Sequence, residues 1–97
     1  MRTRECLNSP HSAPAVGPYS HAVAAGGFLF VSGQVGMDPA TRALCSEDTA
    51  GQARQALDNL RTILEDLGSG LDRVVKTTVF LADIADFAAF NEIYAEY

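Results

Sequence analysis

The side chains in this sequence that could serve as nucleophiles or metal ligands are few and widely spaced. Cys6 and Cys45 have no histidine or basic residue at a spacing typical of an activated thiol, so a nucleophilic thiolate is not predicted. His11 and His21 lie ten residues apart without a further ligand pattern, which argues against a metal site. The glycines within 33–36 have no GK[ST] sequence and precede no helix, so phosphate binding is not indicated.

A resemblance to a known family, given below with the segments that carry it, singles out polar groups that could hold a small substrate. Tyr19 offers an aromatic wall with a hydroxyl that can orient a substrate or a water molecule. Ser32 and the backbone N–H of Gly33 can donate to a carboxylate, because glycine permits close approach of the backbone. Asn91 can fix a loop or a polar group, and Gln34 is a weaker candidate for supporting the strand end. Taken alone, each of these residues has a structural interpretation: backbone pairing, packing over a turn, or a solvent-facing position.

The amino-terminal half must place these groups through loops and short strands. Residues 1–18 hold three of the four prolines and predict an ordered arm or loop. Two short apolar segments, 20–24 and 28–32, flank Ala25-Gly26-Gly27. This pattern predicts a β-hairpin, because glycine reaches positive φ without steric cost.

Residues 49–67 predict an amphipathic helix. Thr49 and Gln52 fit a capping box, and Gly68-Ser69-Gly70 supplies a stop. Asn59 is assigned to the polar, opposite side of the helix. The apolar stripe consists of Ala53, Ala56, Leu57, Leu60, Ile63, Leu64 and Leu67.

The carboxyl-terminal part predicts one more strand and one more helix. Residues 73–81 are rich in β-branched side chains, and a strand after a crossover helix should pair in parallel. Asp83 or Asp86 can cap a second helix that runs to the end. The predicted order is β-β-α-β-α, and its apolar sheet edge would invite pairing with another chain. The apolar face of that helix consists of Phe87, Phe90, Ile93, Tyr94 and Tyr97.

Composition limits the class of protein. A chain of 97 residues has room for one domain, here residues 1–97 of α+β type. The net charge of −5 without a cluster of Lys or Arg argues against nucleic acid as the main partner. No run is long enough to cross a bilayer, and no apolar segment typical of a secretory signal follows residues 1–6. A cytoplasmic protein is expected, with a mitochondrial location as the alternative.

Several segments resemble the RidA (YjgF) family of small enamine/imine deaminases. They occur in the family's order and spacing and cover nearly all of residues 13–97, which is more specific than one short motif. The matching stretches are APAVGPYS at 13–20, FVSGQVGMDP at 30–39, QARQALDNL at 52–60, VVKTTVFLADI at 74–84, Asp86-Phe87 and NEIY at 91–94.

The resemblance implies a chorismate-mutase-like fold, a mixed sheet with two helices on one face, assembled as a homotrimer with active sites between subunits. It also implies hydrolysis of reactive 2-enamine or 2-imine acids, such as 2-iminobutanoate and 2-iminopropanoate, to 2-oxo acids and ammonia. No cofactor or metal is implied. The family's pocket-lining positions fall on Tyr19, Ser32, Gly33 and Asn91.

The sequence departs from the family's pattern in two ways. Family members continue past the second helix with an arginine that clamps the substrate carboxylate and a glutamate that positions water, on strands missing from these 97 residues. His21 stands where glutamine is common. Little or no deaminase activity is therefore expected, because losing a charged anchor costs about 2–5 kcal/mol. The alternatives are a non-catalytic oligomeric binding module, a translation-inhibitor or ribonuclease-like factor, or a truncated form that pairs its bare strand edge with a partner. The arginines that cannot be assigned the clamping role from sequence are Arg42, Arg54, Arg61 and Arg73.

Overall fold

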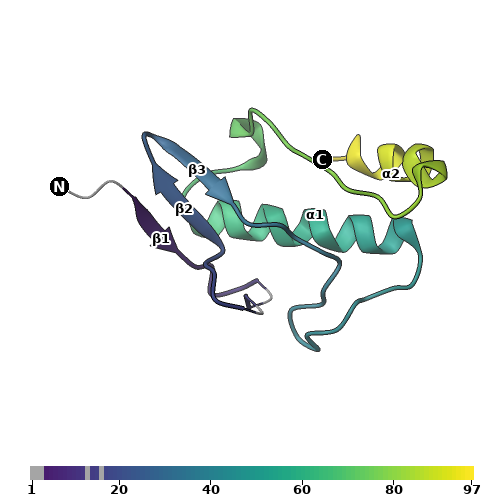
Figure 1. Ribbon diagram of the computed structural model, residues 1–97, viewed down its shortest axis with the longest axis horizontal. Coiled ribbons are helices and arrows are strands. Elements are labelled where there is room, and N and C mark those ends of the chain that lie inside the picture. The colour runs from purple at the N-terminus through teal and green to yellow at the C-terminus, as the bar shows by residue number, and fades with distance from the viewer. Residues whose placement is uncertain (1–3, 13, 16) are drawn as a thin grey trace.

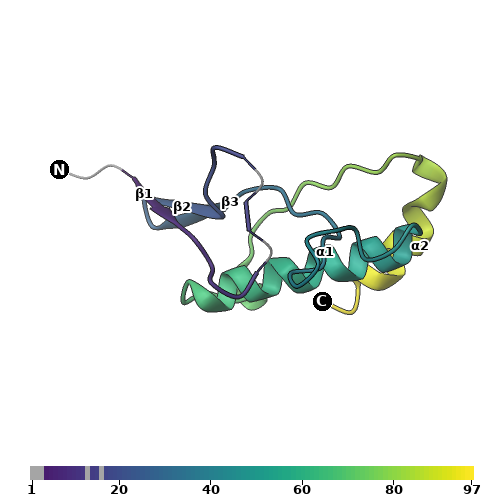
Figure 2. The same cartoon turned by 90° about the horizontal axis from the view of Figure 1, so that it is seen from below.

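The computed structural model describes residues 4–12, 14, 15 and 17–97, and contains a small antiparallel sheet and two α-helices (Figure 1). Residues 1–3 of the predicted arm, and Ala13 and Val16 of the family-like stretch, lie outside the described residues. The strands lie toward the carboxyl-terminal end of helix α1, and helix α2 lies beside its amino-terminal half (Figures 1 and 2). None of the described helices is long and apolar enough to cross a membrane.

The predicted hairpin is confirmed. Strands β2 (Ala22–Ala25) and β3 (Phe28–Val31) pair antiparallel, and the turn between them uses positive φ at Gly26 and Gly27, 59° and 83°. A further strand, β1 (Glu5–Leu7), pairs antiparallel with β2 and gives the order β1-β2-β3. The arm predicted for this region is therefore wrong for residues 5–7.

Helix α1 (Thr49–Asp66) is also confirmed, but its cap differs from the prediction. The Asp48 carboxylate accepts a hydrogen bond from the Gly51 N–H at 2.6 Å. Thr49 and Gln52 do not form a capping box, since the Thr49 hydroxyl donates to Asp86 and the Gln52 amide donates to the Ser46 carbonyl. Among the described residues, the buried apolar ones are Ala22, Ala53, Leu57, Ile63 and Leu64.

The strand predicted for residues 73–81 is wrong. Residues 71–73 form a 3-10 turn, and residues 74–80 continue as an exposed irregular segment that reaches 91% exposure at Phe80. Among the described strands, β3 is paired only with β2, so the expected parallel pairing is absent there. The physical reason is that β-branched side chains favour a strand only where a neighbouring strand accepts their backbone hydrogen bonds.

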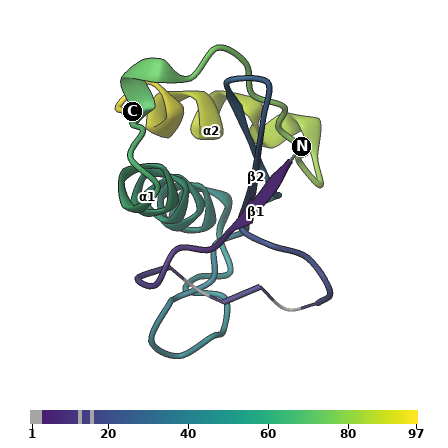
Figure 3. The same ribbon diagram turned by 90° about the vertical axis from the view of Figure 1, so that its left-hand side faces the viewer.

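Helix α2 (Phe87–Tyr94) follows a 3-10 turn over Ile84–Asp86, in which the Asp83 carboxylate accepts from the Ala85 N–H at 2.9 Å. Asp83 thus caps the turn, whereas Asp86, at the α2 N-cap position, makes no capping hydrogen bond. In the view of Figure 3, the sheet and α2 lie on different sides of α1.

The contact between the two helices is completed by polar pairs at the end of the sequence. The Arg54 guanidinium donates to both carboxylate oxygens of Glu96 at 3.0 Å, which lowers the pKa of the Glu96 carboxyl. The Tyr97 hydroxyl donates to Asp58 at 2.6 Å. These pairs fix α2 against the first turns of α1.

Candidate functional site

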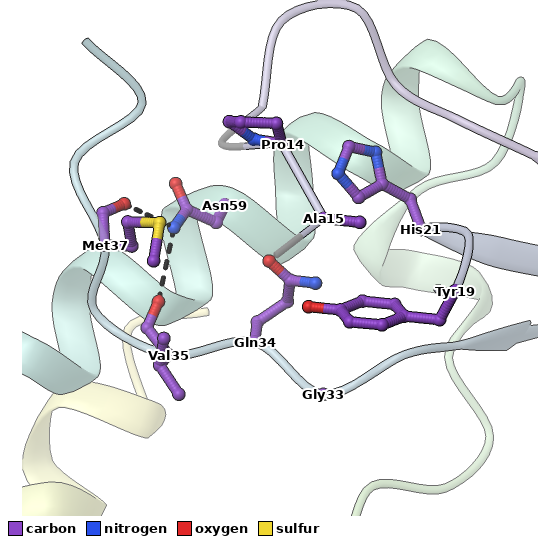
Figure 4. Close-up of a pocket in the computed structure, with 9 residues that line it drawn as sticks. All are labelled: Pro14, Ala15, Tyr19, His21, Gly33, Gln34, Val35, Met37 and Asn59. Carbon is purple, nitrogen blue, oxygen red and sulfur yellow. Dashed lines mark hydrogen bonds between the residues drawn. The ribbon is translucent and has the colours of Figure 1, made fainter. Parts of the chain in front are cut away.

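A pocket of about 300 Å³, part of it open to solvent, lies between the amino-terminal loop, the segment after β3 and helix α1 (Figure 4). Within the described part of the chain, no Lys, Arg, Asp or Glu lines it. The lining residues are Pro14, Ala15, Tyr19, His21, Gly33, Gln34, Val35, Met37 and Asn59.

Asn59 fixes one wall of the pocket. It is 2% exposed, and its amide nitrogen donates to the Val35 carbonyl at 3.3 Å and the Met37 carbonyl at 2.8 Å (Figure 4). Its amide oxygen accepts from Gln55 at 2.9 Å. The assignment of Asn59 to the polar face of the helix is therefore wrong. Its position three residues after Ala56 is neighbour spacing on a helix and was the available signal.

Tyr19 and Gln34 form another side of the pocket. The Tyr19 ring is 47% exposed, and Figure 4 shows its hydroxyl directed toward the Gln34 side chain. The Gln34 amide nitrogen donates to the Ser32 carbonyl at 3.3 Å, so it supports the end of the hairpin as predicted. These two side chains can offer a phenol hydroxyl and an amide to a small polar ligand.

His21 also lines the pocket and is 4% exposed. Its ring Nδ1 accepts a hydrogen bond from the Ser9 backbone N–H at 2.9 Å. The backbone N–H of His21 donates to the Asn8 side-chain oxygen at 3.0 Å. Because the Ser9 N–H donates to it, Nδ1 is the ring nitrogen without a hydrogen. From sequence, His21 was noted only as a departure from the family pattern. The structure shows that its hydrogen bonds connect the amino-terminal loop to the start of β2.

Ser32 and Gly33 lie at the exit of β3. The Ser32 hydroxyl donates to the Ser20 carbonyl at 2.7 Å, and its N–H donates to the His21 carbonyl at 3.0 Å. Gly33 lines the pocket, and a Cβ there would meet no atom within 4 Å. In this structure the Ser32 hydroxyl therefore holds the hairpin entry, while the Gly33 backbone is open to the pocket.

Asn91 is placed elsewhere. It lies on α2, is exposed, and does not line the pocket. The structure thus brings Tyr19, Gly33 and Gln34 together, puts Ser32 directly beside them, and leaves Asn91 apart.

Comparison with known proteins gives this pocket its context. The family model described as Endoribonuclease L-PSP matches residues 10–97. The RutC family protein of Pyrococcus horikoshii is 45% identical over 94 residues, covering 97% of this chain and 75% of that protein. The human 2-iminobutanoate/2-iminopropanoate deaminase is 46% identical over 97% of this chain and 69% of its own length. This chain belongs to the endoribonuclease L-PSP (RidA) family.

Structural similarity to the RidA family is equally broad. The crystal structure of RidA from the Antarctic bacterium Psychrobacter sp. superimposes with a TM-score of 0.89 at 39% identity, covering 95% of this chain and 74% of that one. The expected α+β fold class is therefore confirmed, although the strand order along the chain differs from the prediction at residues 5–7 and 73–81.

Proposed function

We propose that this RidA-family chain binds a small 2-imino or 2-enamino acid in the pocket beside Tyr19 and promotes its hydrolysis. The observation that carries the proposal is that Tyr19, Gly33 and Gln34 converge on one partly enclosed pocket. The human relative at 46% identity, named as a 2-iminobutanoate/2-iminopropanoate deaminase, supports the same chemistry.

The proposed reaction needs orientation and polarisation of the substrate. Water adds to the carbon of the C=N bond, the C–N bond of the resulting adduct breaks, and the products are a 2-oxo acid and ammonia. The Tyr19 hydroxyl and the Gly33 N–H would orient the substrate or the water, because fixed donors in a partly enclosed site lower the cost of developing charge. Ser32 would act by holding this strand end in place. No bound cofactor or metal enters this proposal.

The substrate carboxylate has no cationic partner among the described lining residues. Slow turnover by the chain alone is therefore expected, since a charge-assisted hydrogen bond is about twice as strong as a neutral one. A homotrimer is part of the proposal, supported by the exposed apolar side chains Val75, Phe80, Ile84 and Phe87. In such an assembly Asn91 would act at a pocket of a neighbouring subunit, because it lies outside the pocket of its own chain.

A ribonuclease-like function is the second candidate, favoured by the description of the matching family as Endoribonuclease L-PSP. The charge distribution supports it less. The net charge is −5, and Arg54 and Arg61 form ion pairs with Glu96 and Asp58. Binding to a nucleic-acid backbone requires cations that are available to phosphates. The proposed compartment is cytoplasmic, with a mitochondrial location as the alternative; the free, exposed Cys6 and Cys45 fit a reducing environment.

The test is the release of 2-oxobutanoate from 2-iminobutanoate generated in situ, with Tyr19→Phe as variant. Tyr94→Phe is the matched control, because the Tyr94 hydroxyl contacts Thr77 away from the pocket. Tyr19→Phe should lower the rate above background about tenfold through loss of one orienting hydrogen bond, and the control should leave it unchanged. Equal rates for wild type and Tyr19→Phe, or RNA cleavage in place of deamination, would contradict the proposal.

A further inference from the structure

A second cavity, of about 670 Å³ with part open to solvent, borders the loop that carries Pro14 and Ala15. It is formed by the amino-terminal loop and by the turn that follows Asp38. It shares Pro14, Ala15 and His21 with the first pocket but includes neither Tyr19 nor Gly33. The lining residues are Asn8, Ser9, Pro10, Ser12, Pro14, Ala15, His21, Pro39 and Arg42.

The charge of this cavity is unlike that of the rest of the chain. The chain as a whole carries −5, yet no carboxylate of a described residue lines the cavity, and Arg42 contributes a permanent positive charge. Within the described part of the chain, the Arg42 guanidinium has no hydrogen bond or ion pair, whereas Arg54 and Arg61 are both paired with carboxylates. The cavity is therefore suited to a negatively charged ligand.

The Ser12 hydroxyl is a second, independent observation. Ser12 is 9% exposed, and its side-chain oxygen is buried without a hydrogen-bond partner among the described residues. Leaving a buried hydroxyl without a partner is costly, so such groups usually face a ligand or a water molecule. A ligand with oxygen acceptors in this cavity would satisfy the hydroxyl hydrogen.

The backbone conformation of Arg42 also supports a functional role for this residue. Its φ of 62° is the left-handed region, and it is the only described residue other than glycine with positive φ. Glycine would adopt this conformation without cost, whereas an arginine is strained there. Strain of this kind is concentrated at functional positions, where the side chain offsets its cost.

We propose that this cavity binds a small oxyanion, with the Arg42 guanidinium and the Ser12 hydroxyl as donors. Carboxylates and phosphate share this chemistry, because a guanidinium matches the planar or tetrahedral oxygen pairs of both. Neither proposed donor lines the pocket beside Tyr19, so this proposal stands or fails independently of the deaminase proposal.

The test is titration of the full chain with acetate and, separately, with inorganic phosphate at low ionic strength. Binding is measured by calorimetry or from amide chemical shifts. Arg42→Gln should weaken binding of the anion about tenfold, and Ser12→Ala should weaken it to a smaller extent. Arg73→Gln, an exposed arginine outside the cavity, is the matched control and should leave the affinity unchanged. Preference for acetate or for phosphate identifies the source of the oxyanion, and either one supports the site.

The proposal would be overturned by no saturable binding of either anion, by equal affinity for wild type and Arg42→Gln, or by an equal loss of affinity with Arg73→Gln. Arg42→Gly serves as a second variant, since glycine fits the backbone at this position. It should lose the anion as Arg42→Gln does while remaining folded, as checked by circular dichroism. An Arg42→Gly protein that is folded and still binds would contradict the inference as well.

Discussion

Replacing Asn59 by Asp tests whether this buried amide holds the segment after β3. The two side chains have nearly the same shape, but the carboxylate cannot donate to the Val35 and Met37 carbonyls, which now receive hydrogen bonds at 3.3 and 2.8 Å. A buried acceptor without a partner costs about 1–3 kcal/mol. Val35 is exposed, so water can replace the hydrogen bond to its carbonyl. We therefore expect a total loss of about 2–4 kcal/mol in the free energy of unfolding.

The assay is urea and thermal unfolding followed by circular dichroism. For a chain of this size, a change of 1 kcal/mol moves the melting temperature by about 4–8 °C, so a shift of roughly 8–30 °C is expected. Asn91→Asp is the matched control, because Asn91 lies exposed on α2. It should change the stability by less than about 0.5 kcal/mol. An Asn59→Asp protein as stable as the Asn91→Asp control would refute the role assigned to this residue.

Three further predictions concern single positions. Gly36→Ala should destabilise the protein by about 1–3 kcal/mol in urea unfolding, because its Cβ would lie 2.7 Å from the α1 backbone; Gly33→Ala, with open space around it, should not. The Ser9 hydrogen bond lowers the pKa of Asp66, so the stabilisation is present above the unfolded-state pKa of about 3.9 and is lost as pH falls through the folded-state pKa. Asp66→Asn should therefore flatten the dependence of the melting temperature on pH below about 4; an unchanged slope would count against this pair. Arg42→Gly should raise the free energy of unfolding by about 1 kcal/mol, since it relieves a positive φ; a less stable protein would contradict the strain.

The parts of the fold that could be predicted from sequence are those with a strong local signal. The Gly26-Gly27 turn requires positive φ at both residues, which few other residues tolerate, so the hairpin was predictable. Helix α1 has a long apolar stripe and a clear stop, so its bounds were predictable to within one residue. Strand β1 was missed because its three residues become a strand only through pairing with β2.

The errors come from residues whose state depends on distant neighbours. Residues 74–80 have the composition of a strand, yet a strand also needs a partner for its backbone, and no described strand supplies one. Asn59 was assigned to the polar face by residue type alone, although it lies four residues before Ile63, which is fully buried. In the candidate site, Tyr19, Gly33 and Gln34 could be found through family motifs, whereas the contribution of Asn59 required the structure.

The most direct test of the central claim is to map where the reaction product binds. Amide chemical shifts would be followed during titration with 2-oxobutanoate in the wild type, in Arg42→Gln and in Tyr19→Phe. Arg42→Gln removes the guanidinium of the second cavity, so that binding there does not contribute to the shifts. We expect the shifts to concentrate at Gly33 and Gln34, to persist in Arg42→Gln and to weaken in Tyr19→Phe. Shifts confined to α2, or no saturable shift near Gly33 in either protein, would show that the pocket beside Tyr19 does not take the 2-oxo acid skeleton.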